Sequence, residues 1–138
     1  MSALSNITPL YRLSAPNHPS SPRVCRETVA AVLQATGATA LVDTARLLVS
    51  EAVTNVHRHA EHTRAIHIDV LVQDGAAVIA VKDNDPDGVP LRRPVNPHGE
   101  GGRGLLLVEE LAYRWGVTWL GGEETDRKQV WFELRAPE

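Results

Sequence analysis

Residues 47–60 read LLVSEAVTNVHRHA, and this stretch decides most of what the sequence predicts. Glu51, Asn55 and His59 follow one another at four-residue spacing, on a stripe along the edge of an apolar arc. The pattern predicts an amphipathic helix that holds a carboxylate and an amide at a half-buried border. Such a border suits either an ordinary polar helix edge or a ligand site. The apolar arc, spaced by three and four residues, consists of Leu48, Val49, Ala52, Val53, Val56 and Ala60.

The composition is typical of one compact globular domain. The chain has 138 residues, of which 43% are apolar and 22% charged, so a core can form without disulfides or metal. The net charge of -3 argues against a protein that binds nucleic acid through a basic face. The single cysteine, Cys25, is expected to pack in or beside the core. The chain shows neither a signal-peptide pattern nor a membrane-spanning window, so we expect a cytoplasmic protein that does not bind membranes.

Before the central stretch, the sequence predicts a strand and two helices. Scattered apolar residues within positions 4–15 predict a short leading strand. After a proline-rich loop, a helix is expected from residue 23 to about 36, capped by Ser20 or Ser21. The central stretch then belongs to a helix that runs from about residue 40 to 60.

The clearest local pattern is a β-hairpin. Ile66, Ile68, Val70 and Val72 alternate with other residues, and the alternation resumes at Ala77, Ile79 and Val81. Between the two runs stands Asp74-Gly75, a pair typical of a two-residue hairpin turn. The second strand is expected to end at Asp83, and a long loop without regular period follows it.

A glycine-rich turn closes that loop and opens the next predicted helix. Residues 99–104 read GEGGRG, and apolar residues at helical spacing follow from Leu105 to about Arg114. A glycine-rich turn at a helix start presents backbone amides that favour an anion. Strands at 115–120 and 128–134 complete the predicted elements.

Three signals therefore occur in a fixed order along the chain. Glu51 and Asn55 stand on a helix border, Asp83 closes a strand, and Gly102 and Gly104 precede a helix. Each has a structural alternative, because aspartate often forms turns and glycine often starts helices. Their joint occurrence favours one shared ligand site.

In this arrangement the chain resembles the ATP-binding domain of the histidine-kinase-like (GHKL) ATPase superfamily, specifically actinobacterial proteins similar to anti-sigma-factor serine/threonine kinases. Residues 50–60, SEAVTNVHRHA, resemble the asparagine box of the family, and residues 101–108, GGRGLLLV, resemble its second glycine box. The resemblance implies an α/β two-layer sandwich, the Bergerat ATP-binding fold, with a mixed, mostly antiparallel sheet covered on one face by three helices. Residues 1–22 would form an N-terminal strand and loop, and residues 23–138 the ATP-binding domain, within a single domain overall.

The resemblance also implies a role for each site residue, with ATP and Mg²⁺ as cofactors. Asn55 would ligate the magnesium ion, and Glu51 would be the general base that activates the attacking oxygen. Asp83 would accept a hydrogen bond from the adenine amino group, while the backbone amides of Gly102 and Gly104 would hold the phosphates. The further nucleotide-binding positions are Gly88, Gly101, Arg103 and Leu105.

General chemistry agrees with these roles. Magnesium takes few protein oxygens, so one amide oxygen and the triphosphate oxygens form an adequate set. A carboxylate four residues earlier lies about one helical turn from that amide. A buried acceptor that pairs with the adenine amino group would discriminate against guanine, which presents a carbonyl there.

The chain departs from the family pattern at two places. Asp85 and Asp87 stand where the first glycine box, Asp-x-Gly-x-Gly, has its glycines, and Gln129 stands near the usual threonine of the final strand. Added carboxylates would repel phosphates unless they face solvent, so these departures predict low nucleotide affinity.

The histidines and tryptophans have simpler interpretations. Two histidines that are two residues apart on a helix cannot share a face, so we expect surface histidines rather than a metal site. We expect the tryptophans, at alternate strand positions, to pack in the core or form a partner surface. These residues are His57, His59, His62 and His67, with Trp115, Trp119 and Trp131.

The implied function is an anti-sigma-factor-type serine/threonine kinase that transfers the ATP γ-phosphate to a small antagonist protein. Its partners would be a sigma factor, that antagonist, or both, with a homodimer as an alternative assembly. Two other functions remain open, a catalytically silent partner-binding module and a slow ATPase. The presence of Glu51 favours a catalytic function, whereas Asp85 and Asp87 favour weak nucleotide binding.

Overall fold

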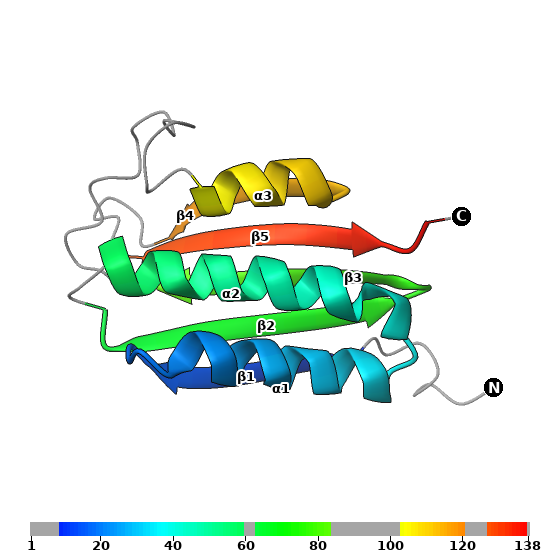
Figure 1. Cartoon of the computed structure of the whole chain (residues 1–138), viewed down its shortest axis with the longest axis horizontal. Coiled ribbons are helices and arrows are strands. Elements are labelled where there is room, and N and C mark those ends of the chain that lie inside the picture. Colours follow the sequence, from blue (N-terminus) through cyan, green and yellow to red (C-terminus); the bar gives the residue numbers. More distant parts are fainter. Residues whose placement is uncertain (1–8, 60–62, 84–102, 121–126, 138) are drawn as a thin grey trace.

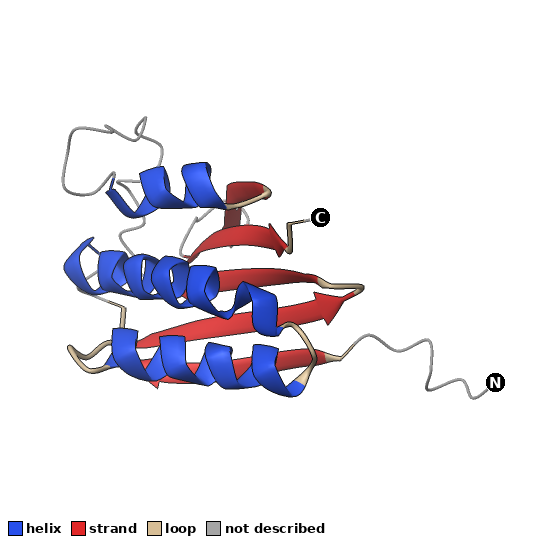
Figure 2. Cartoon of the chain, turned by 45° about the vertical axis from the view of Figure 1, so that its right-hand side comes forward, coloured by secondary structure: helices blue, strands red, loops and turns tan. Residues whose placement is uncertain are grey.

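The computed structural model describes residues 9–59, 63–83, 103–120 and 127–137. Five strands form one sheet in the order β1-β2-β3-β5-β4, and three α-helices lie on one of its faces (Figures 1 and 2). In chain order the elements are β1 (Leu10–Pro16), α1 (Ser21–Ala35), the 3₁₀ helix η2 (Thr39–Leu41), α2 (Val42–His59), β2 (Ala65–Gln73), β3 (Ala76–Asp83), α3 (Arg103–Leu111), β4 (Arg114–Leu120) and β5 (Arg127–Arg135).

The predicted two-layer sandwich with helices on one face is confirmed. Each of the four strand pairs is antiparallel, so the described part of the sheet contains no parallel pair. The last strand, β5, lies between β3 and β4, so it is not an edge strand of the sheet. No helix within the described ranges is long and apolar enough to cross a membrane.

The β2–β3 hairpin follows the sequence pattern closely. Asp74 and Gly75 have φ values of 52° and 76°, so both adopt the left-handed conformation that a two-residue type I′ turn requires. This turn sets the register in which Val70 faces Ile79 and Ile68 faces Val81. The alternating apolar residues consequently point to the helical layer.

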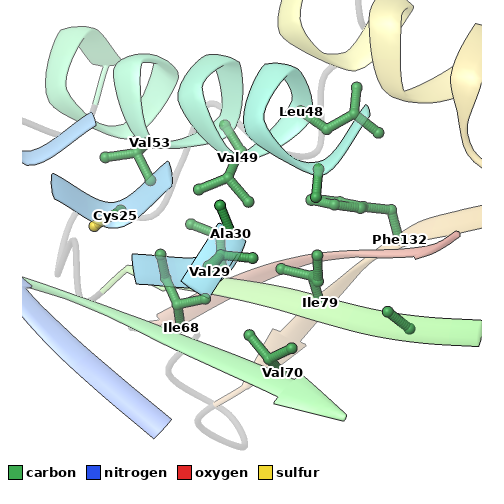
Figure 3. Packing of buried hydrophobic residues seen from close by; sticks show 14 of the residues in the cluster. Cys25, Val29, Ala30, Leu48, Val49, Val53, Ile68, Val70, Ile79 and Phe132 are labelled. Carbon is green, nitrogen blue, oxygen red and sulfur yellow. The ribbon is translucent and has the colours of Figure 1, made fainter. Parts of the chain in front are cut away.

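The core fills the space between the helices and the sheet. Val29 and Ala30 of α1 and Val49 and Val53 of α2 are buried above the central strands (Figure 3). The sheet meets them with side chains that are fully buried or nearly so: Ile66, Ile68, Val70, Ile79, Val81, Phe132 and Leu134. Burial of these side chains is the main force that holds the layers together.

Helix α1 begins and ends by different means. Ser20 occupies the N-cap position, but its side chain makes no capping hydrogen bond, and Ser21 Oγ donates to the carbonyl of Pro16. Ser20 thus stands at the predicted cap position, but the side-chain hydrogen bond expected of a serine cap is not formed. At the other end Gly37, with φ 82°, allows the N–H of Ala38 to reach the carbonyl of Leu33 at 2.8 Å, so the carbonyl at the helix end is satisfied.

Four predicted elements have other boundaries in the structure. Helix α1 begins at Ser21 and not at residue 23, because Ser20 takes the N-cap position. The helix expected from about residue 40 starts as the 3₁₀ turn η2, and α2 itself begins at Val42. The leading strand begins at Leu10, and residues 1–8 lie outside the described ranges. The last helix stops at Leu111 and not at Arg114, because the N–H of Tyr113 donates to the carbonyl of Glu133 on β5 at 2.8 Å.

Candidate functional site

Helix α2 supplies the polar border that the sequence predicts. The described part of its apolar arc, from Leu48 to Val56, is buried against the sheet and α1, whereas Glu51 and Asn55 are half-buried at the edge. Ala60 lies outside the described residues. The two side chains stand one turn apart on the same stripe of the helix. A carboxylate and an amide thus sit at the margin of the core, where a ligand can reach them.

Asp83 closes β3 and points to the helical layer. Its side chain is almost completely buried, with 1% relative exposure. Directly opposite in the β3–β5 register stands Lys128, which has 8% relative exposure. The Nζ atom of Lys128 lies 3.5 Å from Oδ2 of Asp83, so the two charges form a buried ion pair.

Lys128 was not among the predicted site residues, whereas its neighbour Gln129 was noted near the usual threonine of the final strand. In the structure Gln129 faces Lys82, and alternation along β5 turns Gln129 to the opposite face of the sheet from Lys128. A signal was present in the sequence, because Lys128 precedes the buried residues Val130, Phe132 and Leu134 at period two. A lysine in phase with buried residues needs a partner, and Asp83 provides it.

A small pocket joins these elements. It lies between α2, α3 and the sheet, and it has space for about one water molecule. Asn55 and Lys128 supply its polar groups. The rest of the wall is Ala52, Val56, Val81, Val108 and Val130. The structure thus brings Asn55 and Lys128 into one pocket, and the ion pair with Lys128 places Asp83 beside it. Glu51 lies one turn away along α2.

The first turn of α3 lies at the same end of the molecule as the end of α2 (Figure 1). Arg103, Gly104 and Leu105 form its first turn, and Val108, one turn later, lines the pocket. The end of α2, the start of α3 and the start of β5 lie at one end of the sandwich (Figure 1). Of the other predicted positions, Gly88, Gly101 and Gly102 lie outside the described residues, as do Asp85 and Asp87.

A comparison with known families agrees with this arrangement. A family model for the histidine kinase-like ATPase domain matches residues 15–130. The chain belongs to this family. The histidine kinase-like ATPase domain binds ATP, typically with Mg²⁺, and the family includes anti-sigma factors that bind sigma factors. No curated protein gives a significant match to the sequence.

Two of the clustered histidines, His57 and His67, have hydrogen-bond partners. Nδ1 of His57 lies 2.8 Å from Oδ1 of Asn17, and Nδ1 of His67 lies 2.7 Å from Oγ of Ser14. His57 and His67 are both half-buried, so neither is a fully exposed surface residue. His62 lies outside the described part of the chain, and within that part no three metal-binding side chains come together.

Cys25 lies inside the core, as the sequence predicts. Its side chain on α1 is fully buried (Figure 3), and this burial raises the pKa of the thiol. A thiol with a raised pKa stays protonated at neutral pH and is a poor nucleophile. Cys25 is thus a packing residue of the ATPase domain and not part of its chemistry.

Proposed function

We propose that this domain binds Mg²⁺-ATP between α2, α3 and the sheet, and that it acts as an anti-sigma-factor-type serine/threonine kinase. In this proposal the γ-phosphate passes to a hydroxyl of a small antagonist protein. The observation that supports it best is that Asn55 and Lys128 line one pocket and that Lys128 forms an ion pair with the buried Asp83. Membership of the histidine kinase-like ATPase family agrees with the same site.

Asn55 would hold the metal ion. Its half-buried side chain lines the pocket, and a side-chain amide oxygen is a hard ligand of the kind that magnesium prefers. Magnesium usually keeps several waters and takes other ligands from phosphates, so a single protein oxygen is adequate. When bound, the ion would neutralise charge on the phosphates.

Asp83 would recognise the base. Its buried carboxylate at the end of β3 is an acceptor of the kind that pairs with an exocyclic amino group. A hydrogen bond to a charged acceptor contributes about 1.5–3 kcal/mol. This contribution is large enough to select among bases.

Glu51 would act as the general base. Its carboxylate is half-buried and stands one helical turn before Asn55, so it lies next to the proposed metal and phosphate position without occupying the pocket. The carboxylate would accept the proton of a serine or threonine hydroxyl as that oxygen approaches the phosphate. A water molecule in the same place would make the domain an ATPase.

The start of α3 would hold the phosphates. Backbone N–H groups in the first turn of a helix have no partners within the helix and favour an anion. Arg103, Gly104 and Leu105 form that turn, and Gly88, Gly101 and Gly102 are proposed as further nucleotide-binding positions on family resemblance.

The partner of the domain would be a sigma factor, the antagonist protein or a second copy of the chain.

One observation favours a second candidate, a partner-binding module without catalysis. Lys128 already neutralises Asp83, so a base must compete with a buried lysine for the carboxylate. This competition would weaken nucleotide binding. A weakly bound nucleotide would serve a binding module as well as an enzyme.

Transfer of γ-labelled phosphate separates these functions. The purified chain is incubated with Mg²⁺, γ-labelled ATP and the proteins of its source cells, and phosphoamino acids are then identified. A labelled protein carrying phosphoserine or phosphothreonine, lost in Glu51→Gln, supports the kinase. Glu109→Gln, at an exposed position of α3, is the matched control and should retain transfer.

Two other results would redirect the proposal. Free labelled phosphate without labelled protein would indicate an ATPase. ATP binding without transfer or hydrolysis would indicate the silent module. Binding by Glu51→Gln must be measured in parallel, so that a loss of transfer is not confused with a loss of ATP.

A further inference from the structure

A polar pocket lies on the sheet face opposite the three helices, which all cover the other face (Figure 2). We infer that this pocket binds a phosphate group, either as free phosphate or on a phosphorylated side chain. It measures ≈ 280 Å³, and its lining comes from β1, β2, β3 and β5. The pocket is separate from the proposed nucleotide site, which lies on the helical side of the sheet. Its polar lining residues are Arg12, Ser14, His67, Asp69, Lys82 and Arg127.

The strand register fixes the positions from which these side chains extend. The neighbours of His67, Asp69 and Lys82 along β2 and β3 are buried toward the helical layer, so these three side chains point to the opposite face. Ser14, His67 and Lys82 are successive cross-strand partners on β1, β2 and β3. Arg12 stands directly opposite Asp69 in the β1–β2 register. Three paired strands therefore bring these polar groups together.

Positive charge predominates in the pocket. The cationic lining residues are Arg12, Lys82 and Arg127, whereas Asp69 is the one acidic side chain among the described residues that line it. Cations thus outnumber the acid by two in this lining, although the whole chain has a net charge of -3. A concave surface with one predominant sign of charge concentrates ions of the opposite sign.

Polar contacts orient the lining and leave donors for a ligand. Oδ2 of Asp69 lies 2.7 Å from Nζ of Lys82, and Oδ1 lies 3.5 Å from Nε of Arg12. An ammonium and a guanidinium together have more N–H groups than one carboxylate can engage. Nδ1 of His67 lies 2.7 Å from Oγ of Ser14, so this contact engages one of the two ring nitrogens.

Stabilisation of the sheet accounts for only part of this arrangement. Lys82 already neutralises Asp69 at 2.7 Å, and both side chains are partly buried. Arg12 brings a second cation to the same carboxylate, which is more positive charge than neutrality requires. Neighbouring like charges repel each other, and a bound anion would relieve that repulsion.

The charge and the donors suit a phosphate group better than a carboxylate. A phosphate ester carries about −1.5 to −2 charges at neutral pH and has three strong acceptor oxygens. A guanidinium can bind phosphate through two parallel N–H···O bonds. A carboxylate has a single charge and fewer acceptor sites. The side chain of Arg12 is 71% exposed, so water competes for its donors, and we expect a dissociation constant of about 1 mM.

Titration of the isotope-labelled chain with inorganic phosphate, followed through its amide NMR signals, tests the inference. Acetate at the same pH and ionic strength is the reference for the general effect of salt. We expect saturable shifts at His67, Asp69 and Lys82 with phosphate, and no saturable shifts there with acetate. Phosphate-dependent shifts confined to Asn55 and α3 would assign the anion to the proposed nucleotide site and overturn the inference.

Charge-removing variants identify the residues that bind the anion. Arg12→Gln and Lys82→Gln should each weaken phosphate binding by about fivefold, because each removes one nearby positive charge. Arg135→Gln is the matched control, since Arg135 lies on the same sheet face, outside the pocket, and pairs with a carboxylate, that of Glu133. It should leave the affinity unchanged. Thermal unfolding shows whether each variant folds, and the wild-type titration decides even if Lys82→Gln does not.

A second ligand identifies the source of the phosphate group. N-acetyl-phosphoserine amide carries the phosphate on a side chain, so tighter binding of this compound than of inorganic phosphate would support a phosphorylated protein as the ligand. Equal or weaker binding would support free phosphate. Equal shifts with phosphate and acetate, or an unchanged phosphate affinity in folded Arg12→Gln and Lys82→Gln, would overturn the inference. Such a failure would leave the proposed nucleotide site untouched, because that site uses other residues on the other face of the sheet.

Discussion

Nδ1 of His57, near the end of α2, lies 2.8 Å from the side-chain oxygen of Asn17 in the loop before α1. The side-chain amide of Asn17 donates to the carbonyl of Thr63 at 2.8 Å, and its backbone N–H donates to the carbonyl of Arg64 at 3.0 Å. Asn17 thus joins the first loop to α2 and to the segment that enters β2. His57 is two residues beyond Asn55, so these bonds position the helix end that carries the proposed metal ligand.

Asn17→Ala should therefore lower stability, because it removes two side-chain hydrogen bonds and leaves their partners unsatisfied. The expected loss is about 1–3 kcal/mol in the free energy of unfolding, measured by urea denaturation. Asn17→Asp keeps an acceptor for His57 but sets a carboxylate oxygen against the carbonyl of Thr63, so it should not restore the wild-type stability. Equal stability of wild type and Asn17→Ala would show that the contacts contribute nothing.

Gly116 on β4 is expected to tolerate no side chain. It faces Trp131 across the β4–β5 pair, and a Cβ atom at Gly116 would lie 2.8 Å from the indole nitrogen. Gly116→Ala should displace the indole and cost about 1–3 kcal/mol of stability. In a Trp131→Ala background the same substitution should cost much less. An undiminished cost in that background would exclude the indole as the cause.

Glu133 on β5 predicts a pH dependence of stability. Hydrogen bonds from Arg114 at 2.7 Å and Arg135 at 2.6 Å lower the pKa of its carboxyl group. Because the folded pKa lies below the unfolded value of about 4.3, the stabilisation is complete above that pH and is lost as the pH falls through the folded pKa.

Glu133→Gln should remove this contribution. Melting temperatures of wild type and variant should differ most near neutral pH and converge as the pH falls below about 4. Glu109→Gln, at an exposed helix position, is the control for the substitution itself. A constant difference between wild type and Glu133→Gln across this range would contradict the assigned pKa shift.

Asp83→Asn should weaken ATP more than inorganic triphosphate, because the lost interaction is to the base and not to the phosphates. The expected difference is about 1.5–3 kcal/mol in binding free energy. Asp69→Asn is the matched control, since Asp69 also pairs with a lysine but on the opposite sheet face. If both ligands weaken alike, Asp83 has a structural role only.

Much of the fold follows from local patterns in the sequence. The β2–β3 hairpin was predictable because alternation and the Asp74-Gly75 turn agree, and α2 because its apolar arc fits helical spacing. The end of α3 was not predictable, since the bond from Tyr113 to Glu133 depends on β5, which comes later in the chain. Local periodicity carries no information on such a distant partner.

The residues of the candidate site were likewise predictable only where local motifs mark them. Asn55 and Asp83 stand out through local motifs, and the structure places Asn55 in the pocket and Asp83 beside it through Lys128. Lys128 was missed because its importance arises from the β3–β5 register, which sets it opposite Asp83. A lysine next to Gln129 in sequence gives no sign of which strand it will face.

The central claim is a magnesium-dependent ATP site that uses Asn55, and calorimetric titration of ATP with and without Mg²⁺ tests it most directly. We predict that Mg²⁺ strengthens ATP binding to the wild type by about tenfold or more, and that Asn55→Ala loses most of this gain while binding metal-free ATP unchanged. Asn55→Asp, which keeps an oxygen ligand, should retain the gain. Equal affinities of wild type and Asn55→Ala for ATP in the presence of Mg²⁺ would contradict the account.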